Sequence, residues 1–151
     1  MPVNRIVMLC VGVLAAGLCY RGMRVQAAQA QATVDQPVAG LYSTAQAKRG
    51  ADLYQSQQCA VCHGADLGGV GASPPLSGDN FLSVYSGQSI LVLFDKVQKS
   101  MPQSSPGSLT PAQTADLLAY MLSVNKYMAG DEELPADREK LKTIQLPKPA
   151  K

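Results

Sequence analysis

The sequence predicts an all-α fold. Three segments carry apolar side chains at the three- and four-residue steps of a helix. Stretches rich in glycine and proline separate them, and nothing around them has the alternating strand and helix pattern of a βαβ unit. With 151 residues, the chain is long enough for one domain plus its terminal segments.

The first predicted helix covers residues 45–57. Thr44 is a suitable N-cap, and small or apolar side chains recur from Ala47 to Tyr54 along one face. Gly50 lies on that face, where it costs about 1 kcal/mol of helix stability relative to alanine. We therefore expect another backbone to approach closely at this glycine.

Two further helices have clear start signals. Ser89 precedes a helix over residues 90–97. Thr110 and Gln113 form a capping box, with proline at the first helical position, for a helix that ends near residue 124 or 125. Both segments therefore extend the all-α assignment toward the C-terminus.

The remaining segments are less regular. Residues 64–80 and 100–109 are predicted loops, because they are dense in glycine, proline and serine. Residues 81–85 are ambiguous between helix and loop. After residue 125 we expect a charged tail, residues 126–151, with one helical turn near residues 136–141.

The N-terminus has the pattern of an export signal over residues 1–30. Arg5 precedes an apolar run, residues 6–20, and Ala28-Gln29-Ala30 fits a cleavage site. The run is shorter than the roughly 20 residues of a membrane span. We therefore expect cleavage and a periplasmic protein, with an unpatterned linker over residues 31–43.

The basic residues after the apolar run keep a second outcome open. Arg21 and Arg24 are unusual in a cleaved signal, so the segment could instead stay attached as a membrane anchor. Without these two and Arg5, 10 of the 13 basic residues remain against 11 acidic ones. A chain with this balance has no electrostatic feature of a nucleic-acid-binding protein.

The chemistry centres on C-x-x-C-H at residues 59–63, the attachment sequence for haem c. Two thiols three residues apart, Cys59 and Cys62, match the spacing needed to form thioethers with the two haem vinyl groups. His63 follows directly and is the expected axial ligand of the iron. Haem attachment outside the cytoplasm agrees with the export signal.

Three other readings of the motif are weaker. A zinc site needs about four Cys or His ligands, but the chain has one histidine and its other cysteines, Cys10 and Cys19, lie in the apolar N-terminal run. A thioredoxin-like pair needs a βαβ context that is missing here. A plain disulfide between Cys59 and Cys62 is the third alternative.

With a single histidine, the second axial ligand is a methionine or the position is open. Met121 falls in a predicted helix and suits core filling, while Met128 lies in the tail. Met101 stands in a Ser/Pro-rich loop before Pro102, which favours an extended backbone. We predict that Met101 ligates the iron, with core filling as its alternative role.

Together these features resemble class I c-type cytochromes with one haem. The resemblance rests on the first helix, C-x-x-C-H, Pro74-Pro75-Leu76-Ser77-Gly78, the Met101-Pro102 loop and the last helix, and it implies a cytochrome c domain over residues 44–125. It further implies that helices and loops wrap around one covalent haem, and that the first and last helices cross near Gly50 and Tyr120. By the same resemblance, the carbonyl of Pro74 accepts a hydrogen bond from His63 Nδ1–H.

The tail looks like that of small cytochromes linked to quinoprotein (PQQ) dehydrogenases, but the lysine-rich surface of mitochondrial-type carriers is missing near the attachment site. The expected function is one-electron transfer outside the cytoplasm between redox proteins, such as a PQQ-dependent dehydrogenase and a terminal oxidase. Two alternatives are a membrane-anchored haem subunit of a respiratory complex and a peroxidase-like haem enzyme with an open iron position. The last would need a distal acid or base, and no second histidine is present to serve.

Overall fold

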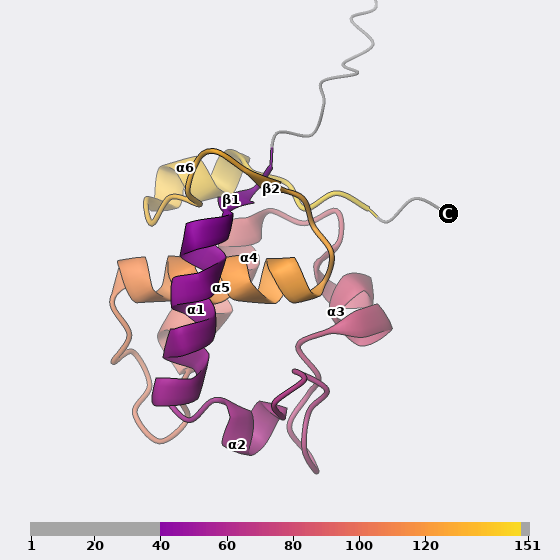
Figure 1. Ribbon diagram of the computed structural model, residues 1–151, viewed down its shortest axis with the longest axis vertical. Helices are drawn as coiled ribbons and strands as arrows, with labels where there is room; N and C mark the ends of the chain where they lie inside the picture. Colours follow the sequence, from indigo (N-terminus) through magenta and orange to yellow (C-terminus); the bar gives the residue numbers. More distant parts are fainter. Residues whose placement is uncertain (1–39, 149–151) are drawn as a thin grey trace, which may run out of the picture. The chain divides into compact units, whose positions relative to one another are not determined.

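The computed structural model describes residues 40–148, so the predicted signal or anchor and most of the predicted linker lie outside the described residues. The described part is mainly helical, which confirms the predicted all-α class. Its elements, drawn in Figure 1, are β1 (Tyr42–Ser43), α1 (Thr44–Ser56), α2 (Ala60–His63), α3 (Gly78–Tyr85), α4 (Ile90–Ser100), α5 (Pro111–Val124), β2 (Ala129–Gly130) and α6 (Arg138–Thr143).

The start signals of the helices act largely as expected. Thr110 and Gln113 form the complete capping box at α5, and the Ser89 hydroxyl caps α4 by accepting the backbone N–H of Leu91. At α1 the cap is Ser43 rather than Thr44, since the Ser43 hydroxyl accepts the backbone N–H of Gln46 at 3.1 Å.

The ambiguous stretch at residues 81–85 belongs to a helix, α3, which begins inside the predicted loop. Its one fully buried side chain is Phe81, whose ring lies 5.0 Å from that of Tyr85 between centroids. The sequence of this segment has little helical periodicity, so packing of Phe81 and the partly buried Tyr85 against the core helps to stabilise the helix.

Helices α1 and α5 cross in close contact, as Figure 1 shows. A Cβ atom added to Gly50 would lie 1.9 Å from the carbonyl oxygen of Asp116, so only glycine allows this approach. One turn along α1, the ring of Tyr54 packs against that of Tyr120 with centroids 5.4 Å apart. The expected crossing at Gly50 and Tyr120 is therefore present.

The segment after α5 differs from a free tail, because residues 126–148 pack against the domain. β2 pairs in parallel with β1, which places residues 42–43, expected as linker, within the fold. Leu134, Leu141 and Leu146 are each at most 2% exposed. Sequence patterning missed this packing because the three leucines are isolated among charged and proline residues and follow no helical period.

A buried amide ties the same segment to the first helix. The Gln46 side chain donates to the carbonyl of Leu134 at 2.9 Å and accepts its N–H at 2.7 Å. Both backbone groups of Leu134 are satisfied in this way, which burial of that residue requires. Among residues 40–148, no helix is both long and apolar enough to cross a membrane.

Candidate functional site

The predicted attachment sequence forms a single tight turn after α1. The backbone N–H of Cys59 donates to the carbonyl of Tyr54 at 3.0 Å, and that of His63 to the carbonyl of Cys59 at 2.9 Å. The Tyr54 hydroxyl donates to the carbonyl of Gly64 at 2.7 Å. Because Tyr54 is itself fixed at the crossing of α1 and α5, it anchors the turn to the helical core.

Gly64 lets the chain leave this turn. Its φ of +78° lies in the region that favours glycine, and a Cβ there would approach the Asp66 carboxylate at 2.8 Å. The following loop folds back on the turn through hydrogen bonds from Gly69 N–H to the His63 carbonyl, at 2.8 Å, and from Val70 N–H to the Cys62 carbonyl, at 3.0 Å. The turn and loop therefore form one hydrogen-bonded unit.

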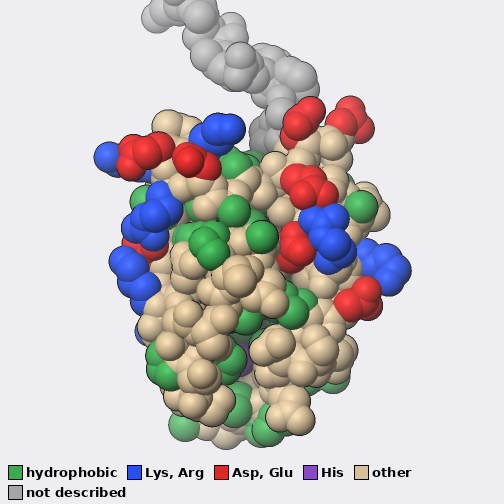
Figure 2. Space-filling view, turned by 90° about the vertical axis from the view of Figure 1, so that its left-hand side faces the viewer, with side chains coloured by type: hydrophobic (Ala, Val, Ile, Leu, Met, Phe, Trp, Pro, Cys, Tyr) green, Lys and Arg blue, Asp and Glu red, His purple; other side chains and the backbone are tan. Residues whose placement is uncertain are grey.

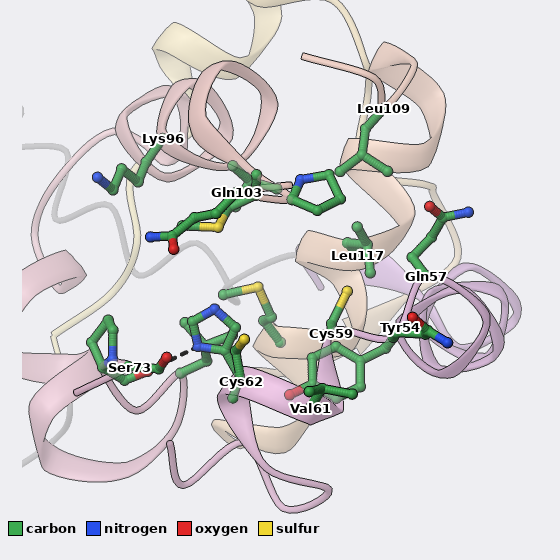
Figure 3. Close-up of a pocket in the computed structure, with 18 of the residues that line it drawn as sticks. Tyr54, Gln57, Cys59, Val61, Cys62, Ser73, Lys96, Gln103, Leu109 and Leu117 are labelled. Carbon is green, nitrogen blue, oxygen red and sulfur yellow. Dashed lines mark hydrogen bonds between the residues drawn. The ribbon is translucent and has the colours of Figure 1, made fainter. Parts of the chain in front are cut away.

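A cavity of about 470 Å³ lies between this turn, α4, α5 and the loop after α4. In Figure 3 the labelled Cys59, Cys62 and Val61 lie on one side, and Gln103 and Leu109 lie on the opposite side. The volume is within the usual range of small-molecule and cofactor sites. Most of the side chains that line it are apolar, among them Val61, Leu76, Leu93, Val97, Met101, Leu109, Leu117 and Met121.

His63 and Pro74 lie together, as the resemblance to class I c-type cytochromes implied. The Nδ1 atom of His63 lies 3.0 Å from the carbonyl oxygen of Pro74, within hydrogen-bond range. The Asn125 side chain fixes the loop just after Pro74, since it donates to the Leu76 carbonyl at 2.9 Å and accepts the N–H of Gly78 at 3.0 Å. The carbonyl of Pro74 is thus held in place from α5.

Met101 directly follows α4 as its C-cap residue. Its backbone is extended (φ −122°, ψ 151°), as expected before proline, and its N–H still donates to the carbonyl of Val97 at 2.9 Å. Met101 lines the cavity, but so does Met121, which is 3% exposed in α5. Met128 is 67% exposed and is not among the lining residues.

The two thiols are free in the structure, so the motif is not a disulfide there. Burial raises the pKa of the Cys59 thiol above its ordinary value, and burial raises the pKa of Tyr54 to about 12. Within residues 40–148 no group of three or more His, Cys, Asp or Glu residues is arranged to hold a metal ion. The zinc alternative therefore has no ligand set in the described chain.

The residues at the cavity fit a covalently bound haem. Two free thiols lie one helical turn apart, and the only imidazole in the chain follows them directly. The apolar lining suits a flat, largely hydrophobic macrocycle. Among the lining residues in the described part of the chain, Lys96 is the only lysine, arginine, aspartate or glutamate.

The surroundings of the site carry little charge. In Figure 2 the charged side chains gather on the upper half of the face, whereas the lower half, around a hollow in which the histidine is visible, is mostly uncharged. Val61 and Val70 are 71% and 54% exposed, close to the attachment turn. Lys96 lines the cavity, whereas Lys99 does not line it and is paired with Asp95 at 2.9 Å.

Most of the lining residues belong to no motif that can be recognised in the sequence. Tyr54 is predicted only to lie on an apolar helix face, and Met121 only to fill the core. The periodic pattern marks an inward face, but it cannot distinguish a residue that contacts other side chains from one that faces a cofactor cavity. A count of aromatic residues was the one available signal, because a core with two phenylalanines and no tryptophan leaves space.

Comparison with protein-family models gave a match to the described domain. A protein-family model described as "Cytochrome C oxidase, cbb3-type, subunit III" matches residues 45–121, just over half of the chain. The match begins in α1 and ends within α5, so it includes the attachment turn, the Pro74 loop and Met101. No curated protein and no solved structure matched in the corresponding searches.

Proposed function

We infer the function from the premise that this chain belongs to the c-type cytochrome family, whose domain it carries at residues 45–121. As a member it is an electron-transfer protein that binds haem c, and the iron of that group supplies one-electron chemistry by cycling between Fe(II) and Fe(III). The attachment thiols are those of Cys59 and Cys62. The finer proposals below concern the ligands of the iron, the redox partners and the cellular location.

We propose a single-haem carrier in which His63 and Met101 hold the two axial positions of the iron. The observation that carries this is the placement of both residues at one cavity, His63 from the attachment turn and Met101 from the end of α4. The Pro74 carbonyl would accept a hydrogen bond from Nδ1–H of His63, which leaves Nε2 free for the metal. A filled sixth position excludes oxygen and peroxide, which suits a carrier rather than a peroxidase-like enzyme.

Replacing Met101 with alanine tests this ligand. Ferric wild-type protein should show the weak near-infrared absorption band of Met-ligated haem c, and the Met101→Ala protein should lose it. The variant should also bind carbon monoxide in the ferrous state and have a lower midpoint potential, because the thioether no longer favours Fe(II). Absorption spectra and a redox titration measure all three.

Two other methionines provide the comparison. Met128→Ala changes an exposed side chain away from the cavity and should leave the spectrum unchanged. Met121→Leu keeps the volume of a buried side chain while removing its sulfur. Loss of the band in the Met121 variant, with retention in the Met101 variant, would transfer the ligand role to α5.

We propose that the protein acts outside the cytoplasm and exchanges electrons with protein partners. The pattern of residues 1–30 supports export, and haem c attachment takes place in the same compartment in bacteria. A PQQ-dependent dehydrogenase as donor and a terminal oxidase as acceptor agree with the resemblance of the tail. The matched family is named for an oxidase subunit, so a second candidate is a haem subunit of a respiratory complex, anchored by residues 6–20.

The weak charge around the cavity predicts that electron transfer to the partner depends little on salt. Exposed Val61 and Val70 favour contact by apolar burial, and charge-steered encounters slow steeply as ionic strength rises. The Debye length falls from about 10 Å at 0.1 M to about 3 Å at 1 M. Stopped-flow rates should therefore change by roughly threefold or less between low and moderate salt.

A strong dependence of the electron-transfer rate on salt would instead indicate electrostatic steering by lysines. Steering by Lys96 and Lys99, both on α4, would give a decrease of more than about tenfold over the same salt series. That decrease should vanish when both lysines are neutralised, in Lys96→Gln/Lys99→Gln. A large salt effect that this double variant removes would overturn the proposed apolar contact.

A further inference from the structure

The C-terminal segment 137–146 is hydrogen-bonded to the start of α4 and to the turn before it. The backbone N–H of Ile90, the first residue of α4, donates to the carbonyl of Ile144 at 2.9 Å. Just before it, the Ser89 hydroxyl lies 3.0 Å from the carbonyl of Leu141. Leu146 adds two backbone hydrogen bonds, by donating to the Gln88 carbonyl at 2.9 Å and accepting from Gly87 N–H at 2.8 Å.

A second connection lies near the middle of α4. Asp95 accepts hydrogen bonds from both terminal nitrogens of the Arg138 guanidinium and from the ammonium of Lys99. The hydrogen bonds from Arg138 lower the pKa of Asp95 to about 2, so this carboxylate stays ionised at neutral pH. A bidentate ion pair of this kind fixes the orientation of the guanidinium and the carboxylate as well as the distance between them.

The opposite side of α4 is buried against the core. Leu93 and Phe94 are each at most 1% exposed, and α4 contacts α5 there. The helix is therefore held between α5 and the segment 137–146, which is anchored by Leu141 at 0% exposed. Met101 is the C-cap of this helix, six residues after Asp95, or about 9 Å along a helix axis.

We propose that segment 137–146 is a clamp that positions Met101 in the cavity. By fixing α4 at its start and at Asp95, the clamp restricts movement of the helix end and slows replacement of the Met101 thioether by external ligands. Arg138 is a positioning residue in this arrangement, because it acts through Asp95 and α4 and does not line the cavity. The inference rests on the proposed ligation by Met101.

The test measures how fast imidazole binds to the ferric haem-loaded protein under excess imidazole. Binding then requires departure of the methionine, so the rate reports how firmly Met101 is held. Arg138→Gln should bind imidazole about threefold to tenfold faster than wild type, while the near-infrared band is retained in the absence of imidazole. Arg138→Lys keeps the charge but not the geometry of two parallel hydrogen bonds, so its rate of imidazole binding should lie between those of wild type and Arg138→Gln.

The matched control is Glu133→Gln. Glu133 lies in the same C-terminal part of the chain and pairs with Arg49 of α1 at 2.9 Å, so its ion pair faces a different helix. Its side chain is 53% exposed, similar to the 48% of Arg138. The control should bind imidazole at the wild-type rate.

Three outcomes would overturn the clamp. The first is a wild-type rate in Arg138→Gln, and the second is equal acceleration in Glu133→Gln, which would indicate general loosening. In either of these two outcomes, Met101→Ala should still bind imidazole much faster than wild type. The ligand assignment would then stand, and only the clamp would fail. The third is a wild-type protein that lacks the near-infrared band and binds as fast as Met101→Ala, which would remove the ligand proposal and the clamp together.

Discussion

A chain with both Cys59 and Cys62 replaced by alanine is expected to lose covalent haem and to accumulate little folded protein. These thiols lie at the edge of a cavity of about 470 Å³ that a haem would fill. Without the haem, apolar side chains from α4 and α5 would lose the group they pack against and would be exposed to water, which costs about 25 cal/mol per Å² of apolar surface. A small domain is stabilised by only about 5–15 kcal/mol, so losing this burial removes a large part of its stability.

Extraction and circular dichroism measure this effect. In wild-type protein, acidified organic solvent should leave the haem on the polypeptide, because thioethers resist that treatment. Each single variant, Cys59→Ala or Cys62→Ala, keeps one thiol and should retain part of the covalent haem. Release of the haem from wild type would contradict the attachment role. A double variant that folds normally would contradict the expectation that the domain depends on the haem for its stability.

The local part of the site could be predicted because its signals are local. The spacing of Cys59, Cys62 and His63 is a property of five consecutive residues, and α2 forms over that stretch. The start of α5 is similar, since Thr110 and Gln113 satisfy one another's backbone across three positions. Signals of this kind depend little on the rest of the fold.

The C-terminal connections could not be predicted because each joins residues far apart in sequence. Gln46 meets Leu134 across 88 positions, and Arg138 meets Asp95 across 43. Nothing in the sequence around Gln46 shows that the backbone of a distant loop residue will lie beside its side chain. For the same reason, the sequence does not show where the packed part of the chain ends. The burial of Leu141 depends on contacts with other elements rather than on its neighbours in sequence.

Replacement of Gly50 by alanine or valine is expected to be among the most destabilising single changes in the protein. The new Cβ would lie 1.9 Å from the carbonyl oxygen of Asp116 and 2.9 Å from the Cβ of Tyr120. Backbone atoms cannot rotate away, so α1 and α5 must separate. Overpacking typically costs about 1–3 kcal/mol, and the approach here is closer than most.

Alanine gains about 1 kcal/mol of helix propensity over glycine, which offsets part of that cost. We therefore expect a net loss of about 2 kcal/mol of unfolding free energy for Gly50→Ala and more for Gly50→Val, measured by denaturant titration of the haem-loaded protein. Ala45→Val, at an exposed position of the same helix, controls for β-branching and should cost less than about 1 kcal/mol.

Separation of the two helices should also reach the attachment turn. Tyr54 packs on Tyr120 at the crossing and donates to the carbonyl of Gly64 directly after His63. A displaced α1 carries Tyr54 with it and weakens that hydrogen bond, so the Gly50 variants should bind imidazole faster as well as unfold more readily. A Gly50→Val protein as stable as wild type would mean that α1 and α5 do not pack at this distance, and that the crossing does not hold the turn in place.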